Sequence, residues 1–309
     1  MVDDAIAGLV GRGLVHSTHA RAAGLDPRTL RRAAAASRVV RVRRDAYLDT
    51  ERWQDLSPRS RYRLQVEAAS RSLSGPVFTH FSAAVVWDLP LIGRWPAEVH
   101  VAGSAARGGR SWPGVVRHAS DLDVPVVNHD GIRVTDAAAT VIDMARVSPF
   151  ATALAMADHA LRTKIASAEG LVEAAAALGA RRGSRAARRV AELADHLSES
   201  AGESLSRARM IELAAPLPRL QHTVRDARGF VARADFWWEH LGLVGEFDGR
   251  LKYRVDGLED QAAVEERVWT EKLREDRIRA TGLGVTRWTW QTALDARAFA
   301  AHLRAAGVL

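Results

Sequence analysis

The sequence predicts an α/β chain of several domains, an α+β multidomain protein. Three successions of elements support this fold class. Short helices and two β-type runs alternate over the first sixty residues, and helices mix with a strand hairpin in the middle of the chain. The last third runs helix, three strands, a long charged helix and a further strand. We therefore expect four segments: 1–58, a mixed α/β block 59–165, a helical connector 166–198, and 199–309 with a central mixed sheet.

The composition excludes several classes of protein. The 309 residues are 47% hydrophobic and include no cysteine, which excludes disulfides, thiolate metal sites and cysteine nucleophiles. No apolar run approaches the ~18 residues of a membrane span, and the first residues lack the pattern of a signal peptide. We expect a cytoplasmic protein with no membrane partner.

The positive charge is concentrated near the N-terminus. Residues 1–63 hold 13 arginines against 7 acidic residues, whereas residues 199–309 hold 17 basic and 17 acidic residues. A localised basic excess is typical of a module that binds a polyanion.

The first sixty residues predict a winged helix. After a helix at Asp3–Gly11, a short helix capped by Ser17 or Thr18 ends at Gly24, and Asp26 caps a third helix over 27–36. A helix, a turn and an arginine-bearing helix form the arrangement whose second helix enters the major groove of DNA, and the β-type runs that follow would form a wing. The residues expected to contact DNA are Arg28, Thr29, Arg31, Arg32, Arg41, Arg43 and Arg44. The alternative is a small helical domain whose arginines are surface charge.

The middle of the chain offers few chemical signals. We expect helices over 59–73, 78–89 and 135–146, strands over 97–101 and 115–118, and a hairpin turning at Asp130-Gly131. His80, His100, His118 and His129 lie singly in separate elements, so we interpret them as structural histidines. The segment 149–197 is expected to be helical with a break at 178–184, and its arginines 181, 182, 185, 188 and 189 would either reach nucleic acid or form a solvated face.

The stretch 231–253 carries most of the candidate chemistry. Apolar runs around 236–238 and 241–244 predict paired strands, with Asp235 opening the first and Glu246 and Asp248 closing the second. Carboxylates at the ends of neighbouring strands converge, and a divalent cation binds several oxygen ligands at short range. The alternative is a hairpin whose acids and lysine are solvated turn residues.

Two resemblances carry these expectations further. Ala22-Ala23-Gly24-Leu25, Leu30-Arg31-Arg32 and Arg41-Val42-Arg43-Arg44 before Tyr47 resemble the winged-helix N-terminus of AbiEi-type antitoxins, and the middle block looks like the second half of those proteins. The C-terminal third resembles the PD-(D/E)xK nuclease superfamily, and more narrowly the domain related to very-short-patch-repair endonucleases. The blocks that match this domain are Ala234-Asp235-Phe236, Gly245-Glu246-Phe247-Asp248-Gly249, Glu271-Lys272-Leu273-Arg274-Glu275-Asp276 and Arg287-Trp288-Thr289-Trp290.

The second resemblance implies a metal-dependent site. Asp235 and Glu246 would bind Mg²⁺ or Mn²⁺, and Glu203 from the preceding helix would add a carboxylate. The sequence departs from the superfamily where Asp248 stands in place of the usual lysine. Only three lysines occur, so Lys252 or Lys272 would have to supply the ammonium. The alternative for Lys272 is an ion pair with Asp276 on a solvated helix face.

Three functions remain open at this stage. The first is DNA cleavage or nicking by phosphodiester hydrolysis, directed by the N-terminal module. The second is an antitoxin-like transcriptional regulator with a degenerate nuclease domain, and the third is a repair or defence component that needs a partner nuclease. A homodimer and a cognate toxin stay open as partners. An intact set of Asp235, Glu246 and Lys252 around a divalent ion would favour cleavage, whereas carboxylates paired to arginines would favour the other two.

Overall fold

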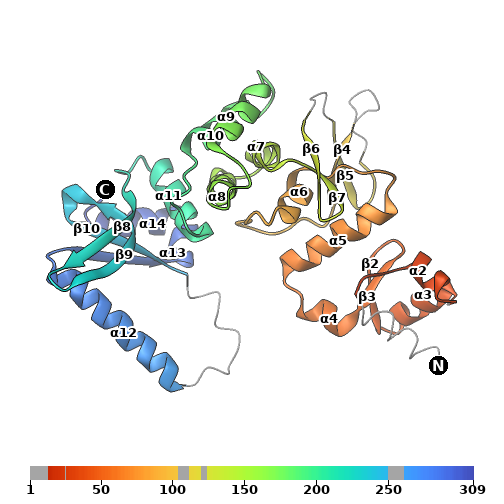
Figure 1. Ribbon diagram of the computed structural model, residues 1–309, viewed down its shortest axis with the longest axis horizontal. Coiled ribbons are helices and arrows are strands. Elements are labelled where there is room, and N and C mark those ends of the chain that lie inside the picture. The colour runs from red at the N-terminus through yellow and green to blue at the C-terminus, as the bar shows by residue number, and fades with distance from the viewer. Residues whose placement is uncertain (1–12, 25, 104–110, 120–123, 250–260) are drawn as a thin grey trace. The chain divides into compact units, whose positions relative to one another are not determined.

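The computed structural model describes residues 13–24, 26–103, 111–119, 124–249 and 261–309. In these ranges the chain is an α+β protein with several small sheets of mixed strand direction (Figure 1), which confirms the expected fold class. None of the helices in the same ranges is long and apolar enough to cross a membrane. The chain divides into two compact units, residues 1–144 and 145–309. Each is described by itself.

Unit 1 begins with a three-stranded antiparallel sheet and two helices. Its elements are β1 (Val15–His16), α2 (Ser17–Ala22), α3 (Pro27–Ala35), β2 (Val39–Arg43) and β3 (Ala46–Asp49), with strand order β1-β3-β2. The predicted cap of α3 is confirmed, since Asp26 Oδ1 accepts a hydrogen bond of 2.8 Å from the Arg28 amide. The predicted cap of α2 is wrong: His16 precedes the helix, because the Ser17 amide is already bonded to the Asp45 carbonyl. The helix expected at 3–11 lies outside the described residues.

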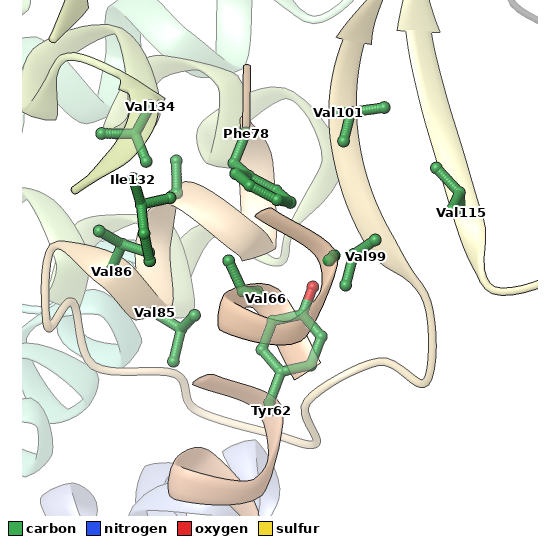
Figure 2. Packing of buried hydrophobic residues seen from close by; sticks show 12 residues of the cluster. Tyr62, Val66, Phe78, Val85, Val86, Val99, Val101, Val115, Ile132 and Val134 are labelled. Atoms are coloured by element: carbon green, nitrogen blue, oxygen red, sulfur yellow. The ribbon is translucent and has the colours of Figure 1, made fainter. Parts of the chain in front are cut away.

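The rest of unit 1 contains a hydrophobic core that includes Phe78. Its elements are α4 (Thr50–Asp55), α5 (Pro58–Ser72), α6 (His80–Val86), β4 (Val99–Gly103), β5 (Val115–Ala119), β6 (Val126–His129), β7 (Ile132–Thr135) and α7 (Ala137–Val147). Phe78 is fully buried and bridges Val101 on one side and Val134 on the other, so the helix expected from Phe78 begins two residues later. Figure 2 shows this ring among the side chains of α6, β4 and β7, with Tyr62 of α5 closing the cluster.

The predicted hairpin of unit 1 is confirmed. Strands β6 and β7 pair antiparallel, and Asp130 and Gly131 between them have φ of 52° and 78°. Two positive φ angles in a two-residue loop define the turn that matches the twist of the flanking strands, and Asp-Gly is a preferred pair there.

Unit 2 opens with four helices. They are α8 (Phe150–Arg162), α9 (Ala168–Ala177), α10 (Ser184–Leu193) and α11 (Ala201–Glu212), and the predicted break at 178–184 separates α9 from α10. Among them, α8 packs against α11. Arg207 of α11 donates to Asp158 of α8 over 2.6 Å, and the Asp158 side chain is completely buried. This buried pair ties α8 to the C-terminal domain, so the boundary between the units lies within the segment expected to run from 59 to 165.

The C-terminal domain contains a four-stranded sheet. The strands are β8 (Arg219–Asp226), β9 (Gly229–Trp238), β10 (Leu243–Asp248) and β11 (Gly284–Thr289), in the order β11-β10-β9-β8, and only the β10–β11 pair among them is parallel. The long helix α12 (Gln261–Ala280) precedes β11, and α13 (Trp290–Leu294) and α14 (Ala296–Ala305) follow it. The succession helix, three strands, helix, strand agrees with the expectation from the sequence.

The strand limits differ from those expected. Asp235 lies inside β9, which runs on to Trp238. Glu246 lies inside β10, which begins at Leu243 and ends at Asp248. Leu241 belongs to a short 3-10 helix, η2 (Glu239–Leu241), and Gly242 has φ of 54°. The candidate carboxylates therefore lie on paired strands rather than in turns.

A close approach between α11 and β10 generates a stability prediction. A methyl group added at Gly202 would lie 1.9 Å from the Phe247 ring, so we expect Gly202→Ala to lower the free energy of unfolding by about 1–3 kcal/mol through overpacking. The matched control is Gly249→Ala, whose added methyl would lie 3.8 Å from the same ring. Denaturant titrations followed by tryptophan fluorescence measure both. Equal stabilities for the two variants would contradict the packing described for α11.

Candidate functional site

Asp235 is the centre of an acidic site on the sheet. Its Oδ2 accepts a hydrogen bond of 2.8 Å from the Phe247 amide of the neighbouring strand. The β9–β10 pairing ends with Gly245 opposite Phe236, and Asp235 and Glu246 are the next residues on the two strands. Burial, Glu203 and Glu246 raise the pKa of Asp235 to about 7, with burial the largest cause. The site therefore holds carboxyl groups close enough to oppose each other's ionisation.

Glu203 approaches the same site from α11. It is buried, and burial raises the pKa of its carboxyl group. Its Oε2 accepts hydrogen bonds from the Glu199 amide (2.8 Å) and from the side-chain amide of Gln221 (3.0 Å). The predicted third carboxylate thus lies within the electrostatic reach of Asp235, fixed by neutral donors rather than by a cation.

Gln221 is a site residue that the sequence did not predict. It lies on β8, and the β8–β9 register places it opposite Asp235. Its φ is 54°, a left-handed conformation that costs free energy in a residue other than glycine. The hydrogen bond to Glu203 is formed in this conformation. No local sequence pattern distinguishes such a glutamine from others in a strand.

Glu246 is held by two arginines from different elements. Arg274 of α12 donates to its Oε2 over 2.8 Å, and Arg287 of β11 places Nη2 at 2.8 Å from the same oxygen as an ion pair. Both guanidinium groups also contact Glu271, at 2.7 Å and 2.6 Å. The parallel register sets Arg287 directly beside Glu246 on β11. These arginines are a contact across elements that sequence spacing does not reveal.

The donor set suits a hard cation, but its side chains are not arranged around one. Glu246 Oε1 is buried without a hydrogen-bond partner, and Asp235 lies among acids, so oxygen ligands for Mg²⁺ or Mn²⁺ are present. In the described part of the chain, no three carboxylates or imidazoles converge closely enough to enclose a metal ion. The other carboxylate oxygen of Glu246, Oε2, is paired with Arg274 and Arg287.

The residues expected to supply the ammonium occupy different places. Lys252 lies outside the described residues. Lys272 is exposed on α12, where its Nζ is 5.8 Å from the centre of the Trp269 ring. The two-residue separation from Arg274 turns it to the opposite side of the helix from Glu246. Asp248 lies at the end of β10, beside Thr289 of β11.

The N-terminal helix α3 separates its arginines from its core side. Leu30 and Ala33 are fully buried, whereas Arg28, Arg31 and Arg32 are exposed. The exposed set follows the spacing of one helix face. Thr29, which was expected to contact DNA, is buried at 7% exposure and belongs with the core side.

The arginines of the predicted wing differ in their surroundings. Arg41 and Arg44 are exposed, and Arg44 lies 3.7 Å from the Asp45 carboxylate. Arg43 is half-buried and donates to the Gly114 carbonyl over 3.0 Å. Arg43 therefore ties the β2–β3 hairpin to the rest of unit 1, while the other two face solvent.

Three of the four histidines in the middle block meet in the structure. The rings of His80 and His118 stack with 3.6 Å between centres, and His118 Nε2 lies 2.8 Å from His100 Nδ1. Burial, with a smaller contribution from His118, lowers the pKa of His100 to about 4. The expectation that these residues lie singly is wrong, because β4, β5 and the start of α6 bring distant positions together.

Comparisons with known proteins add sequence relatives of unassigned role. No family model matches the chain. The uncharacterized proteins Rv2248 and MT2308 of Mycobacterium tuberculosis, strains ATCC 25618 / H37Rv and CDC 1551 / Oshkosh, are each 36% identical to it over 118 residues. The match covers 38% of this chain and 44% of each relative. It extends over less than half of either relative.

The raised pKa of Asp235 predicts a pH-dependent stability. The folded chain keeps a proton that the unfolded chain releases above the ordinary value of 3.8, so this group's contribution falls as the pH rises towards about 7 and is flat above that. Asp235→Asn should therefore be more stable than the original chain above pH 7, on the order of a few kcal/mol, with the difference shrinking in acid. Denaturant titrations across this range measure it. The exposed Asp276→Asn is the control, and a difference for Asp235→Asn that stays constant with pH would exclude the assigned environment.

Proposed function

We propose that the chain is a DNA-binding protein whose C-terminal domain cleaves or nicks DNA by metal-dependent phosphodiester hydrolysis. The observation that carries the proposal is the acidic surroundings of Asp235, a buried carboxyl group on β9 whose pKa both Glu203 of α11 and Glu246 of β10 raise. Opposed carboxyl groups are relieved either by a proton or by a bound cation. The succession helix, three strands, helix, strand, on which the PD-(D/E)xK resemblance rests, supports the same function.

Each residue of the site has a task that follows from its position. Asp235 and Glu246 would hold Mg²⁺ or Mn²⁺, with Glu203 as a further carboxylate at the same place. When bound, the cation would lower the pKa of a water molecule and offset charge on the phosphate. The Phe247 amide fixes the orientation of Asp235, and Gln221 fixes that of Glu203. These neutral donors orient the acids without neutralising them.

The N-terminal unit would bring the site to DNA. The exposed face of α3 would enter the major groove, and Arg41 and Arg44 of the hairpin would contact phosphates. This function places the protein in the cytoplasm with DNA as its partner.

A second candidate is supported by one specific observation. Glu246 is paired with Arg274 and Arg287, and such pairing favours a non-catalytic, antitoxin-like regulator. In that function the C-terminal domain would bind without turnover, because the arginines already balance the carboxylate. Asp248 in place of the superfamily lysine points the same way.

Cleavage assays separate the two candidates. Supercoiled and linear DNA are incubated with Mg²⁺ or Mn²⁺ and the original chain, Asp235→Asn or Glu246→Gln. We expect metal-dependent cutting that both substitutions reduce by at least roughly a hundredfold, because each removes a charged ligand. The control is Arg297→Ala, an exposed residue of α14. A chain that binds DNA but never cuts it would make the regulator the better description.

The role of α3 is tested by the salt dependence of DNA binding. Arg31→Ala together with Arg32→Ala should weaken binding and reduce the slope of log K against log salt by about 0.9 for each phosphate that is no longer neutralised. Fluorescence anisotropy with a labelled duplex measures the slope. Arg297→Ala again serves as the matched removal of an exposed arginine, from the other unit. An unchanged slope in the double variant would rule out α3 as the main contact.

A further inference from the structure

The two arginines that hold Glu246 have the features of an anion site. Arg274 and Arg287 come from α12 and β11, and their side chains are 30% and 27% exposed, whereas that of Glu246 is 10% exposed. The carboxylate is therefore less exposed than the two arginine side chains that contact it. Guanidinium groups bind carboxylates and phosphates through the same forked arrangement of donors.

The hydrogen bonds at this place are incomplete in the described part of the chain. Arg287 Nε and Glu246 Oε1 are buried without a hydrogen-bond partner, whereas Arg287 Nη2 lies 2.8 Å from Glu246 Oε2 and 2.6 Å from Glu271 Oε1. Buried polar atoms normally have partners, and a buried donor without one costs about 1–3 kcal/mol. The atoms without partners are thus a donor of Arg287 and an acceptor of Glu246. A ligand with several acceptor oxygens would satisfy these donors better than one shared carboxylate oxygen.

The charges of the network define what such a ligand would displace. Glu246 and Glu271 both contact the two guanidinium groups, and Glu275 lies 3.5 Å from Arg287. Three carboxylates thus face two arginines, so a further anion can bind only if one of the acids leaves. Glu271 and Glu275 are on α12 and outside the Asp235 site, whereas Glu246 is adjacent to Asp235. Among these three acids, Glu246 is therefore the one that can leave the arginines by moving towards Asp235.

We propose that Arg274 and Arg287 form a phosphodiester-binding site and that Glu246 occupies it as a stand-in for the phosphate. This inference rests on the proposed function for the location of the site on a DNA-binding chain. A DNA phosphate takes the two guanidinium groups, and Glu246 is released towards Asp235, where it is available to a cation. In this exchange, Arg287 of β11 and Arg274 of α12 supply the positive charge next to the phosphate. The nuclease resemblance would assign that charge to a lysine on β10, where this chain has Asp248. The exchange also couples the two ligands, because each favours the same position of Glu246.

Metal-free DNA binding tests the exchange without requiring cleavage. A labelled duplex of random sequence is titrated in EDTA, at a pH of about 8.5 so that Asp235, with a pKa of about 7, is ionised. Glu246→Gln leaves an isosteric but weaker competitor for the arginines, so we expect it to bind roughly tenfold more tightly. Asp235→Asn removes the same charge nearby without freeing an arginine, and should tighten binding much less.

Double variants locate the effect. The gain from Glu246→Gln should disappear when Arg287→Gln or Arg274→Gln is added, and should persist when Arg279→Gln is added. Arg279 is the matched control because it lies on α12 and is paired with Glu275 alone among the described acids. The near-ultraviolet circular dichroism of each variant checks that its tryptophan environment is retained. Arg287→Lys, which keeps a charge, should retain part of the gain.

The outcomes distinguish this inference from the proposed function. Equal gains for Glu246→Gln and Asp235→Asn would mean general electrostatic repulsion and would overturn the phosphate site. A gain that survives the removal of either arginine, or no gain at all, would overturn it too. Should the coupling be present while the original chain never cuts DNA, the phosphate site stands and the nuclease proposal fails. Cutting without the coupling gives the reverse conclusion.

Discussion

The structure of the C-terminal domain depends on how it accommodates carboxyl groups away from water. Glu203, Asp235 and Glu246 come from α11, β9 and β10, and the first and last of these acids each raise the pKa of Asp235. Neutral donors satisfy Glu203 and Asp235, while two arginines satisfy Glu246. The domain thus treats one acid as an ion pair and the others as acids whose ionisation is opposed. That asymmetry gives the two parts of the site different chemistry.

The packing beneath the strands keeps this arrangement rigid. Gly245 directly precedes Glu246 on β10, and a methyl group added at Gly245 would lie within 3.0 Å of Trp238 and Trp288. Trp288 in turn donates from Nε1 to Ser206 Oγ of α11 over 2.7 Å and is almost completely buried. Because the aromatic layer fills this face of β10, the other face is where Glu246 and its arginines lie. A small residue and large rings therefore determine where the carboxylate points.

The elements could be predicted from the sequence because their signals are local. Asp26 before Pro27 marks a helix start, and Asp130-Gly131 between apolar runs marks a hairpin, and both are present. The limits of β10 were missed because Leu241 and Gly242 continue the apolar pattern while forming a turn. Local pattern does not encode tertiary contacts, which explains the missed partners of Glu246. Arg274 and Arg287 are 28 and 41 positions away in the sequence, and only the parallel pairing of β10 with β11 and the docking of α12 bring them there.

The same limit applied to the histidines and to Thr29. His100 and His118 are on neighbouring parallel strands, and their contact follows from that pairing rather than from any spacing between them. Thr29 lies between exposed arginines in the sequence, yet helical periodicity turns it towards the core. Asp235 and Glu246 were predicted because each stands at the end of an apolar run, and Glu203 because the nuclease resemblance implied it. The arginine partners of Glu246 were not predicted, since they come from distant elements, α12 and β11.

The contact of Arg274 with Glu246 makes α12 part of the candidate site. A lysine on β10 would be positioned by the strand itself, but Arg274 reaches Glu246 only while α12 stays docked on the sheet. That docking rests on fully buried Ile278 and on the pair between Arg277 and Asp226, whose oxygen lies 2.8 Å from Nη2. Neither contact involves Glu203, Asp235 or Glu246, so the packing of α12 on the sheet does not depend on the candidate site. The position of Arg274 on Glu246 therefore depends on packing contacts that lie outside the candidate site.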